Sequence, residues 1–197
     1  MIGIIDYGAG NLFSVLNSIR YLGYPVKVLK DPSEFKDVDR IVLPGVGSFG
    51  IAIQNLISSR FYNSILEWID SKRPFLGICL GLQLLFEFSE ESPGVKGLSI
   101  IRGYVKKFNV KKVPHIGWNL AMVCGDSAFS KSLKDDFYYF IHSYYVVPEE
   151  DVGLFKTEYY IEYISGIIKD NIVAVQFHPE KSSFAGLNFL KKWIELC

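Results

Sequence analysis

Hydrophobic residues along this chain fall into short runs that alternate with longer stretches of helical spacing. The runs have the length and apolar character of buried strands, and they cover Ile2–Ile5, Pro25–Leu29, Arg40–Leu43, Phe75–Ile78 and Ile172–Phe177. Apolar residues recur at helical intervals after Asn11 through Leu22, over Ile51–Asp70, from Leu80 to about Phe88, and over Ala185–Leu196. Strands that alternate with helices in this way predict an α/β fold with an open, mostly parallel sheet flanked by helices.

A small β-rich insert is predicted between these two groups of elements. The pattern indicates strands at Leu98–Ile101 and Tyr104–Val110, a strand passing into a loop over Asp136–Val147, and a hairpin over Gly153–Gly166. Between them, PHIGWN carries His115 in a turn-like setting, and a lone histidine of this kind is usually structural. Because no repeat, low-complexity tract or linker interrupts the chain, residues 1–197 are expected to form a single domain.

Composition narrows the classes of function. The chain has 197 residues, 49% of them hydrophobic, and its 21 basic residues balance its 21 acidic residues, so no basic surface suggests nucleic-acid binding. No apolar stretch has the length of a membrane span, and the N-terminus lacks the pattern of a signal peptide. The three cysteines, Cys79, Cys124 and Cys197, are too sparse for a disulfide framework or a zinc site. We therefore expect a cytoplasmic protein without a metal.

The stretch FLGICLGLQ, residues 75–83, is the strongest candidate for chemistry. Cys79 follows a predicted strand, precedes a predicted helix, and is flanked by Gly77 and Gly81. This pattern is the sulfur counterpart of the G-x-S-x-G nucleophile elbow. A thiol at a helix N-terminus is favoured as thiolate, and the backbone N–H of Leu80 could stabilise an oxyanion. The alternative is a small apolar core residue, which is the usual environment of a free cysteine.

Two glycine-rich loops follow predicted strands. Pro44–Gly50, with Gly45 and Gly47, could supply free backbone N–H groups at the carboxyl edge of a parallel sheet, or it could be an ordinary loop. Residues 6–11 read DYGAGN and lack the third glycine of a dinucleotide-binding fingerprint. We therefore expect a tight turn there, with Asn11 capping the following helix.

A second chemical motif follows the last predicted strand. His178 and Glu180 are two residues apart, so in extended backbone they face the same side, and Pro179 disfavours a helix at His178. An imidazole oriented by a carboxylate can activate a thiol. A polar strand end with a surface glutamate is the alternative for this motif. Together with Cys79, the pair suggests a Cys/His/Glu triad.

GICLGLQ and HPEKS resemble the corresponding motifs of the class I, triad-type glutamine amidotransferases. Further segments along nearly the whole chain are similar to one branch, the glutaminase subunit of imidazole glycerol phosphate synthase in histidine biosynthesis: DYGAGN, LPGVGSFG, PHIGWN and YYFIHSYYV. The first two motifs specify only the superfamily, whereas PHIGWN and DYGAGN point to the branch.

The resemblance implies a role for each matching residue. Cys79 would be the nucleophile, His178 the base and Glu180 its orienting carboxylate. Gly45, Gly47 and Leu80 belong to the segments that would form the oxyanion region. The glutamine substrate would be held by Gln83, Glu91, Ser143 and Tyr144. Asn11, Trp118 and Lys181 lie in segments that the family places toward its partner.

The resemblance also implies a reaction and a partner. Cys79 would attack the glutamine side-chain amide, and hydrolysis of the glutamyl thioester would yield glutamate and ammonia without a cofactor. The ammonia would pass to a cyclase subunit with a (β/α)₈ barrel, in a heterodimer. Three alternatives remain at this point: a related glutaminase serving another acceptor enzyme, such as one making an amidated surface sugar; a non-catalytic interaction subunit; and an independent cysteine hydrolase with another γ-glutamyl substrate.

Overall fold

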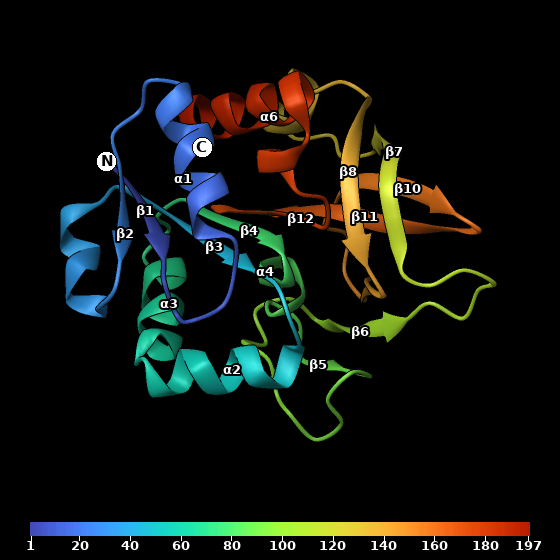
Figure 1. Cartoon of the computed structure of the whole chain (residues 1–197), viewed down its shortest axis with the longest axis horizontal. Helices are drawn as coiled ribbons and strands as arrows, with labels where there is room; N and C mark the ends of the chain where they lie inside the picture. Colours follow the sequence, from blue (N-terminus) through green and yellow to red (C-terminus); the bar gives the residue numbers. More distant parts are fainter.

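The computed structural model describes residues 1–197, and its centre is one 12-stranded sheet (Figure 1). The strands along its main path run in the order β2-β1-β3-β4-β12-β11-β10-β7-β8. The first five of these are parallel to one another: β1 (Ile2–Ile5), β2 (Val26–Leu29), β3 (Arg40–Gly45), β4 (Phe75–Cys79) and β12 (Ile172–Val175). The α/β class predicted from the hydrophobic pattern is confirmed, although the sheet as a whole is mixed.

Helices cover both faces of the parallel half (Figure 1). One face carries α1 (Leu12–Tyr21) and α6 (Ser183–Leu196); the other carries α2 (Phe49–Ser58) and α3 (Phe61–Asp70), with η1 (Pro32–Asp37) at the edge beside β2. Alternate strand residues enter the two resulting cores, so Ile41 and Leu43 pack with α2 and α3 whereas Val42 packs with α1 and α6. Burial on both faces explains why these strands are continuous apolar runs.

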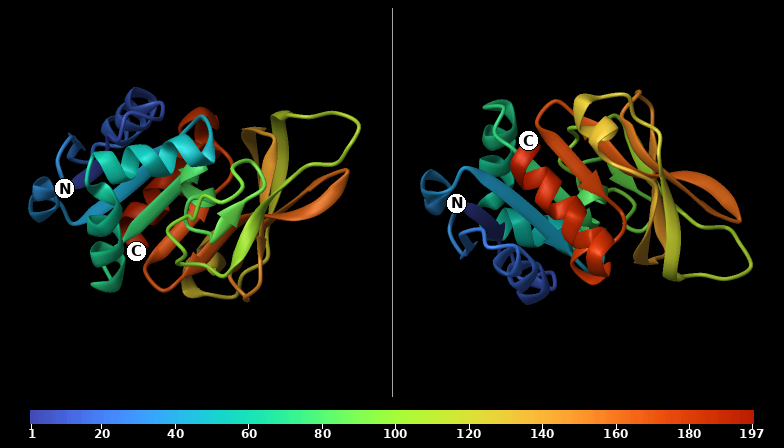
Figure 2. Two further views of the ribbon diagram at one scale, coloured as in Figure 1. Left: turned by 90° about the horizontal axis from the view of Figure 1, so that it is seen from below. Right: turned by 90° about the horizontal axis from the view of Figure 1, so that it is seen from above.

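The β-rich segment extends the same sheet with antiparallel strands and projects beyond the helix-covered half (Figure 2). Its elements are β6 (Gly103–Lys107), β7 (His115–Val123), β8 (Asp136–His142), β9 (Tyr144–Pro148), β10 (Gly153–Tyr159) and β11 (Ile161–Lys169), with the short β5 (Phe88–Ser89) and α5 (Ala128–Ser132). The predicted hairpin is confirmed as β10 and β11. The predicted turn around His115 is wrong, because this segment pairs with β8 over seven residues. The predicted loop before Val147 is also wrong, because β9 pairs with β6.

Three predicted helical features differ in the structure. Ile51–Asp70 is two helices, because Arg60 adopts a left-handed conformation with φ 64° between α2 and α3. Asn11 occupies the N-cap position of α1, but its side chain makes no capping hydrogen bond.

The helix after Cys79 is much shorter than predicted, since α4 spans only Leu80–Gln83. The carbonyls of Leu84 and Leu85 accept hydrogen bonds from Leu98, Ile100 and Ile101 instead of from a following helical turn. The same bonds explain why Leu98–Ile101 is a loop and not the predicted strand. No helix in the structure is long and apolar enough to cross a membrane.

Candidate active site

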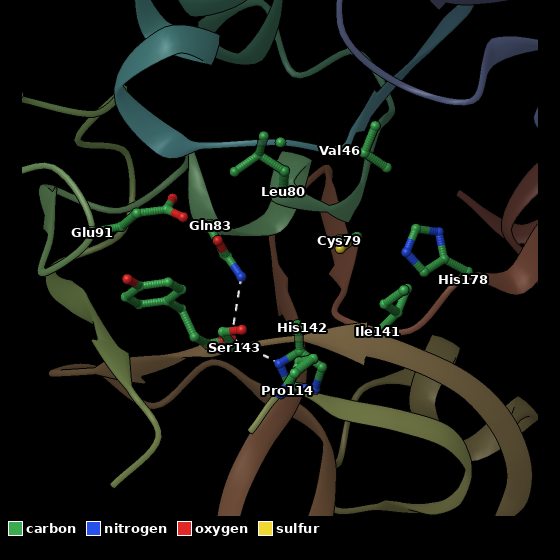
Figure 3. Close-up of a pocket in the computed structure, with 12 residues that line it drawn as sticks. Val46, Cys79, Leu80, Gln83, Glu91, Pro114, Ile141, His142, Ser143 and His178 are labelled. Carbon is green, nitrogen blue, oxygen red and sulfur yellow. Dashed lines mark hydrogen bonds between the residues drawn. The ribbon is translucent and has the colours of Figure 1, made fainter. Parts of the chain in front are cut away.

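The carboxyl ends of β3, β4 and β12 meet at one cavity of about 320 Å³ (Figure 3). Gly45 at the end of β3 lies in register with Cys79 at the end of β4, and His178 follows β12. The cavity is lined by Val46, Gly47, Cys79, Leu80, Gln83, Glu91, Pro114, Ile141, His142, Ser143, Tyr144 and His178. The topology therefore brings together the nucleophile candidate, the base candidate and every predicted substrate-binding residue.

Cys79 occupies a strained strand-to-helix turn, with φ 54° and ψ −106°. The flanking glycines make this turn possible. A Cβ atom on Gly81 would lie 2.0 Å from the Leu43 carbonyl oxygen, and one on Gly77 would lie 2.8 Å from the Gly81 carbonyl oxygen. Gly45 is equally constrained, because its Cβ would lie 2.8 Å from that of Leu80. The predicted sharp turn between strand and helix at Cys79 is thus confirmed.

His178 and Glu180 form a buried pair behind the cavity. His178 Nδ1 lies 2.8 Å from Glu180 Oε1, and the two side chains are only 3% and 2% exposed. Their approach does not come from extended backbone, as the sequence suggested, because Glu180 lies in the 3₁₀ turn η2 (Pro179–Lys181). His178 Nε2 is buried without a hydrogen-bond partner, which is the arrangement expected of a base that awaits a reacting group.

The electrostatic surroundings keep His178 protonated. Burial by itself lowers the pKa of His178, but the charge of the Cys79 sulfur and its interaction with the imidazole, followed by the hydrogen bond that the imidazole donates to Glu180, outweigh burial and raise the pKa to about 10. Figure 3 shows the His178 ring turned toward Cys79. The arrangement therefore favours an imidazolium beside the sulfur, ready to donate a proton to a leaving group.

The opposite side of the cavity presents Gln83 and Glu91 (Figure 3). Gln83 Nε2 donates to the Tyr144 carbonyl over 3.2 Å and to Gln176 Oε1 over 3.0 Å, so both of its donors have partners and its oxygen remains as an acceptor. Glu91 Oε2 accepts from the Phe49 N–H over 2.7 Å and thereby fixes the start of α2. These contacts leave one carboxamide and one carboxylate available to an amino-acid ligand.

The loop between β3 and α2 forms another wall of the cavity. Gly47 has φ 103°, a conformation that side chains disfavour, and a Cβ at this position would meet no atom within 4 Å. Gly47 and Leu80 both line the cavity together with Cys79. The predicted oxyanion segments are therefore adjacent to the sulfur.

Several residues of the site had no clear signal in the sequence. Besides Val46, Pro114 and Ile141, the structure adds His142 to the cavity wall and places Gln176 behind it. His142 Nδ1 lies 2.7 Å from the Tyr144 carbonyl and must donate to it, because that oxygen can only accept.

The other ring nitrogen of His142 makes two further contacts inside the protein. His142 Nε2 lies 3.1 Å from His115 Nδ1 and 3.1 Å from the Tyr163 hydroxyl, so the lone histidine of PHIGWN is part of a buried network. Burial lowers the pKa of His142 to about 3 and that of His115 to about 4, which keeps both rings neutral.

The three predicted interface residues lie outside the cavity. Asn11 precedes α1 and is half-buried, Lys181 ends η2 and is exposed, and Trp118 on β7 is 53% exposed. The structure leaves them available at the surface but shows no contact that assigns them a partner.

Comparisons with known proteins agree along the whole length. Residues 3–195 match the family model of class-I glutamine amidotransferases. The imidazole glycerol phosphate synthase subunit HisH of Methanothermobacter thermautotrophicus is 47% identical over 197 residues, covering 100% of this chain and 98% of that protein. The chloroplastic imidazole glycerol phosphate synthase hisHF of Arabidopsis thaliana is 41% identical over 200 residues, covering 98% of this chain but 34% of that protein. A crystal structure of a glutamine amidotransferase superposes with a TM-score of 0.78 at 14% identity, covering 98% of both chains, which supports the fold alone.

Proposed function

Because the chain belongs to the class-I glutamine amidotransferase family, we propose that it is the glutaminase subunit of imidazole glycerol phosphate synthase, in histidine biosynthesis. The observation that carries the proposal is the meeting of the Cys79 elbow with the His178–Glu180 pair at one cavity. The continuous sheet supports residues 1–197 acting as a single glutamine amidotransferase domain. Three unpaired cysteines are in keeping with activity in the cytoplasm.

The reaction begins with attack of the Cys79 thiolate on the side-chain amide carbon of glutamine. Backbone N–H groups at Leu80 and in the Gly45–Gly47 segment stabilise the oxyanion that develops. His178, held as imidazolium by the sulfur and Glu180, protonates the leaving nitrogen, and ammonia departs. His178, now neutral, then takes a proton from water, which hydrolyses the thioester and releases glutamate.

Substrate recognition is assigned to the opposite wall. The free Gln83 oxygen and the Glu91 carboxylate suit the donors of the glutamine α-ammonium group, and the backbone at Ser143 and Tyr144 lies beside them. Because Glu91 already bonds the Phe49 N–H, an ammonium group there would share its carboxylate with the start of α2.

The partner in this proposal is the cyclase subunit, a (β/α)₈ barrel, in a heterodimer. The hisHF protein, in which this chain's counterpart occupies about a third of the length, supports a physical association with such a subunit. Trp118 packs on Tyr139 with ring centroids 6.3 Å apart, and the Tyr139 N–H donates to Ser182 beside Lys181. The exposed aromatic rings of Phe13 and Phe184 flank these elements and favour burial by a partner.

The proposal is tested by measuring glutamate formation from glutamine with and without a purified cyclase subunit and its nucleotide ligand. We expect strong stimulation by the partner and its complete loss in Cys79→Ala. Hydrolysis that depends on Cys79 but never responds to the cyclase would assign the chain to another acceptor enzyme. Absence of turnover that depends on Cys79 in every pairing would reject the glutaminase activity.

A further inference from the structure

A second glutamine side chain lies between the nucleophile and the substrate wall. Gln176 follows β12, and its residue is 0% exposed. Its Nε2 donates to the Cys79 sulfur over 3.5 Å, and its Oε1 accepts from Gln83 Nε2 over 3.0 Å. A fully buried amide in this position connects the reacting atom to a residue of the opposite wall.

Hydrogen bonds with neighbouring groups fix the orientation of the Gln176 amide. The Tyr144 carbonyl can only accept, so Gln83 must turn its NH₂ group toward that oxygen. The same NH₂ group reaches Gln176, which must therefore accept with its oxygen. The NH₂ group of Gln176 is then left facing the sulfur. The Tyr144 carbonyl thus orients Gln83, and Gln83 orients Gln176. The result is that a hydrogen-bond donor, and not an acceptor, faces Cys79.

We propose that Gln176 is a further catalytic residue, whose carboxamide donates a hydrogen bond to the Cys79 thiolate and holds the sulfur in its reactive position, with Gln83 and the Tyr144 carbonyl as positioning groups. A donor stabilises the charged sulfur more than the neutral thiol. The inference rests on the proposed function in so far as Cys79 is the nucleophile of that reaction.

The other groups that face the sulfur do not supply this bond. His178 is the acid and base of the reaction. The Tyr7 hydroxyl donates to the Pro44 carbonyl over 2.9 Å, and the Tyr163 hydroxyl lies 3.1 Å from His142 Nε2. Burial raises the pKa of both tyrosines well above its usual value, so both stay neutral.

The test follows the reactivity of Cys79 itself. In a background of Cys124→Ser and Cys197→Ser, the rate of alkylation by iodoacetamide is measured against pH for the full chain, alone and with the cyclase subunit. We expect Gln176→Leu to move the midpoint of the profile up by about one pH unit, which is a tenfold change in the ratio of thiolate to thiol at a given pH. Gln176→Glu, which puts a carboxylate at the sulfur, should move it at least as far.

Two further variants separate this role from a general loss of stability. Ser130→Ala removes the hydrogen bond from the buried Ser130 to the Ser127 carbonyl at the start of α5, away from the cavity, so it should lower the thermal midpoint without moving the alkylation profile. Gln83→Leu removes the orienting donor but keeps Gln176, and it should move the profile in the same direction by a smaller amount.

An unchanged midpoint in Gln176→Leu or in Gln176→Glu would overturn the inference, as would a shift of equal size in Ser130→Ala. Shifted midpoints in a protein that never hydrolyses glutamine would support the inference about the thiolate and reject the proposed function.

Discussion

At the scale of single residues, the site depends on polar atoms that are buried and incompletely paired. His178 Nε2 and Glu180 Oε2 are both buried without a hydrogen-bond partner, although Nδ1 and Oε1 of the same residues lie 2.8 Å apart. An unpaired buried polar atom destabilises a fold by about 1–3 kcal/mol. A site that retains two of them has its reacting groups in place before a ligand arrives.

Glu180→Gln should disable the base without removing it. The neutral amide no longer stabilises the imidazolium, so the pKa of His178 should fall below its value of about 10. We expect kcat for glutamine hydrolysis in the complex to fall by about 10²-fold or more. An NMR titration of the His178 ring should show the lowered pKa directly. Glu149→Gln, an exposed carboxylate away from the cavity, is the matched control and should change neither quantity. Retention of full kcat in Glu180→Gln would contradict the assigned role.

Gly47→Ala should separate backbone geometry from stability. Alanine disfavours φ 103°, so the loop must either bear about 1–2 kcal/mol of strain or change its peptide orientation beside Cys79. We expect glutaminase activity to fall by at least tenfold. Gly23→Ala is the control, because Gly23 has φ 84°, is equally open, and lies away from the cavity after α1. Both variants should lower the thermal midpoint similarly, and equal loss of activity in both would show that the Gly47 backbone has no specific role.

At the scale of elements, the contact between α6 and η2 sets the position of Glu180. Gly186 in α6 lies so close to η2 that a Cβ atom would come 1.8 Å from the Pro179 carbonyl oxygen. Ser182 adds a hydrogen bond to the His178 carbonyl over 2.6 Å and accepts one from the Tyr139 N–H over 2.9 Å. The catalytic pair is therefore held by a helix, a turn and a strand together.

Gly186→Ala should consequently reduce activity as well as stability. Because the atom in contact belongs to the backbone, the turn must move, and the cost should be about 1–3 kcal/mol of the free energy of unfolding. Urea unfolding and kcat should both be measured. Asn188→Ala in the same helix, at an exposed position, should leave both nearly unchanged. A destabilised Gly186→Ala with undiminished kcat would show that the position of η2 is not critical.

The elements of the parallel half could be predicted because their apolar runs are buried on both faces. The lengths of helices could not, since they depend on distant backbone partners: the chain after Gln83 leaves the helix to bond with Leu98–Ile101. The antiparallel strands were predicted incompletely for a related reason. Edge pairing such as that of β7 with β8 is set by tertiary register, which a local pattern does not contain.

The same limit applies to the site. Cys79 and His178 carry local signals, a glycine bracket and an H-x-E spacing. The paired histidines and Gln176 carry none, because their roles arise from neighbours 27 and 97 positions away in the chain. Residue type alone does not distinguish a buried amide that orients a thiol from one that only packs.

At the scale of the whole molecule, all three histidines of the chain are buried within the same region. His115, His142 and His178 are 3%, 6% and 2% exposed. Burial keeps the first two neutral, whereas the sulfur and Glu180 keep the third charged. The fold therefore keeps two histidines neutral and one protonated. Its stability should consequently fall at both acid and alkaline pH.

The free energy of unfolding should be greatest near pH 6.5–7. The pKa values of His115 and His142 lie below the unfolded value of 6.5, so their contribution is complete above pH 6.5 and is lost as the pH falls toward about 4 and about 3. Together they should reduce stability by roughly 3 kcal/mol at pH 5. The pKa of His178 is raised, so its contribution is complete below pH 6.5 and is lost as the pH rises through about 10.

Urea unfolding between pH 5 and pH 9 measures both limbs. The window from pH 5 to pH 6.5 isolates the histidines, because carboxyl groups ordinarily titrate near pH 4, and hydrogen bonds from Ser33 and Lys27 hold the pKa values of Asp31 and Glu34 lower still. His115→Gln removes one titrating group while Tyr163 still bonds His142, and it should roughly halve the slope of the acid limb. Glu180→Gln should make the alkaline limb shallower, since the contribution of the sulfur remains, and leave the acid limb intact. A stability that is constant from pH 5 to pH 6.5, or an acid slope unaffected by His115→Gln, would show that the histidine pair is not kept neutral by burial.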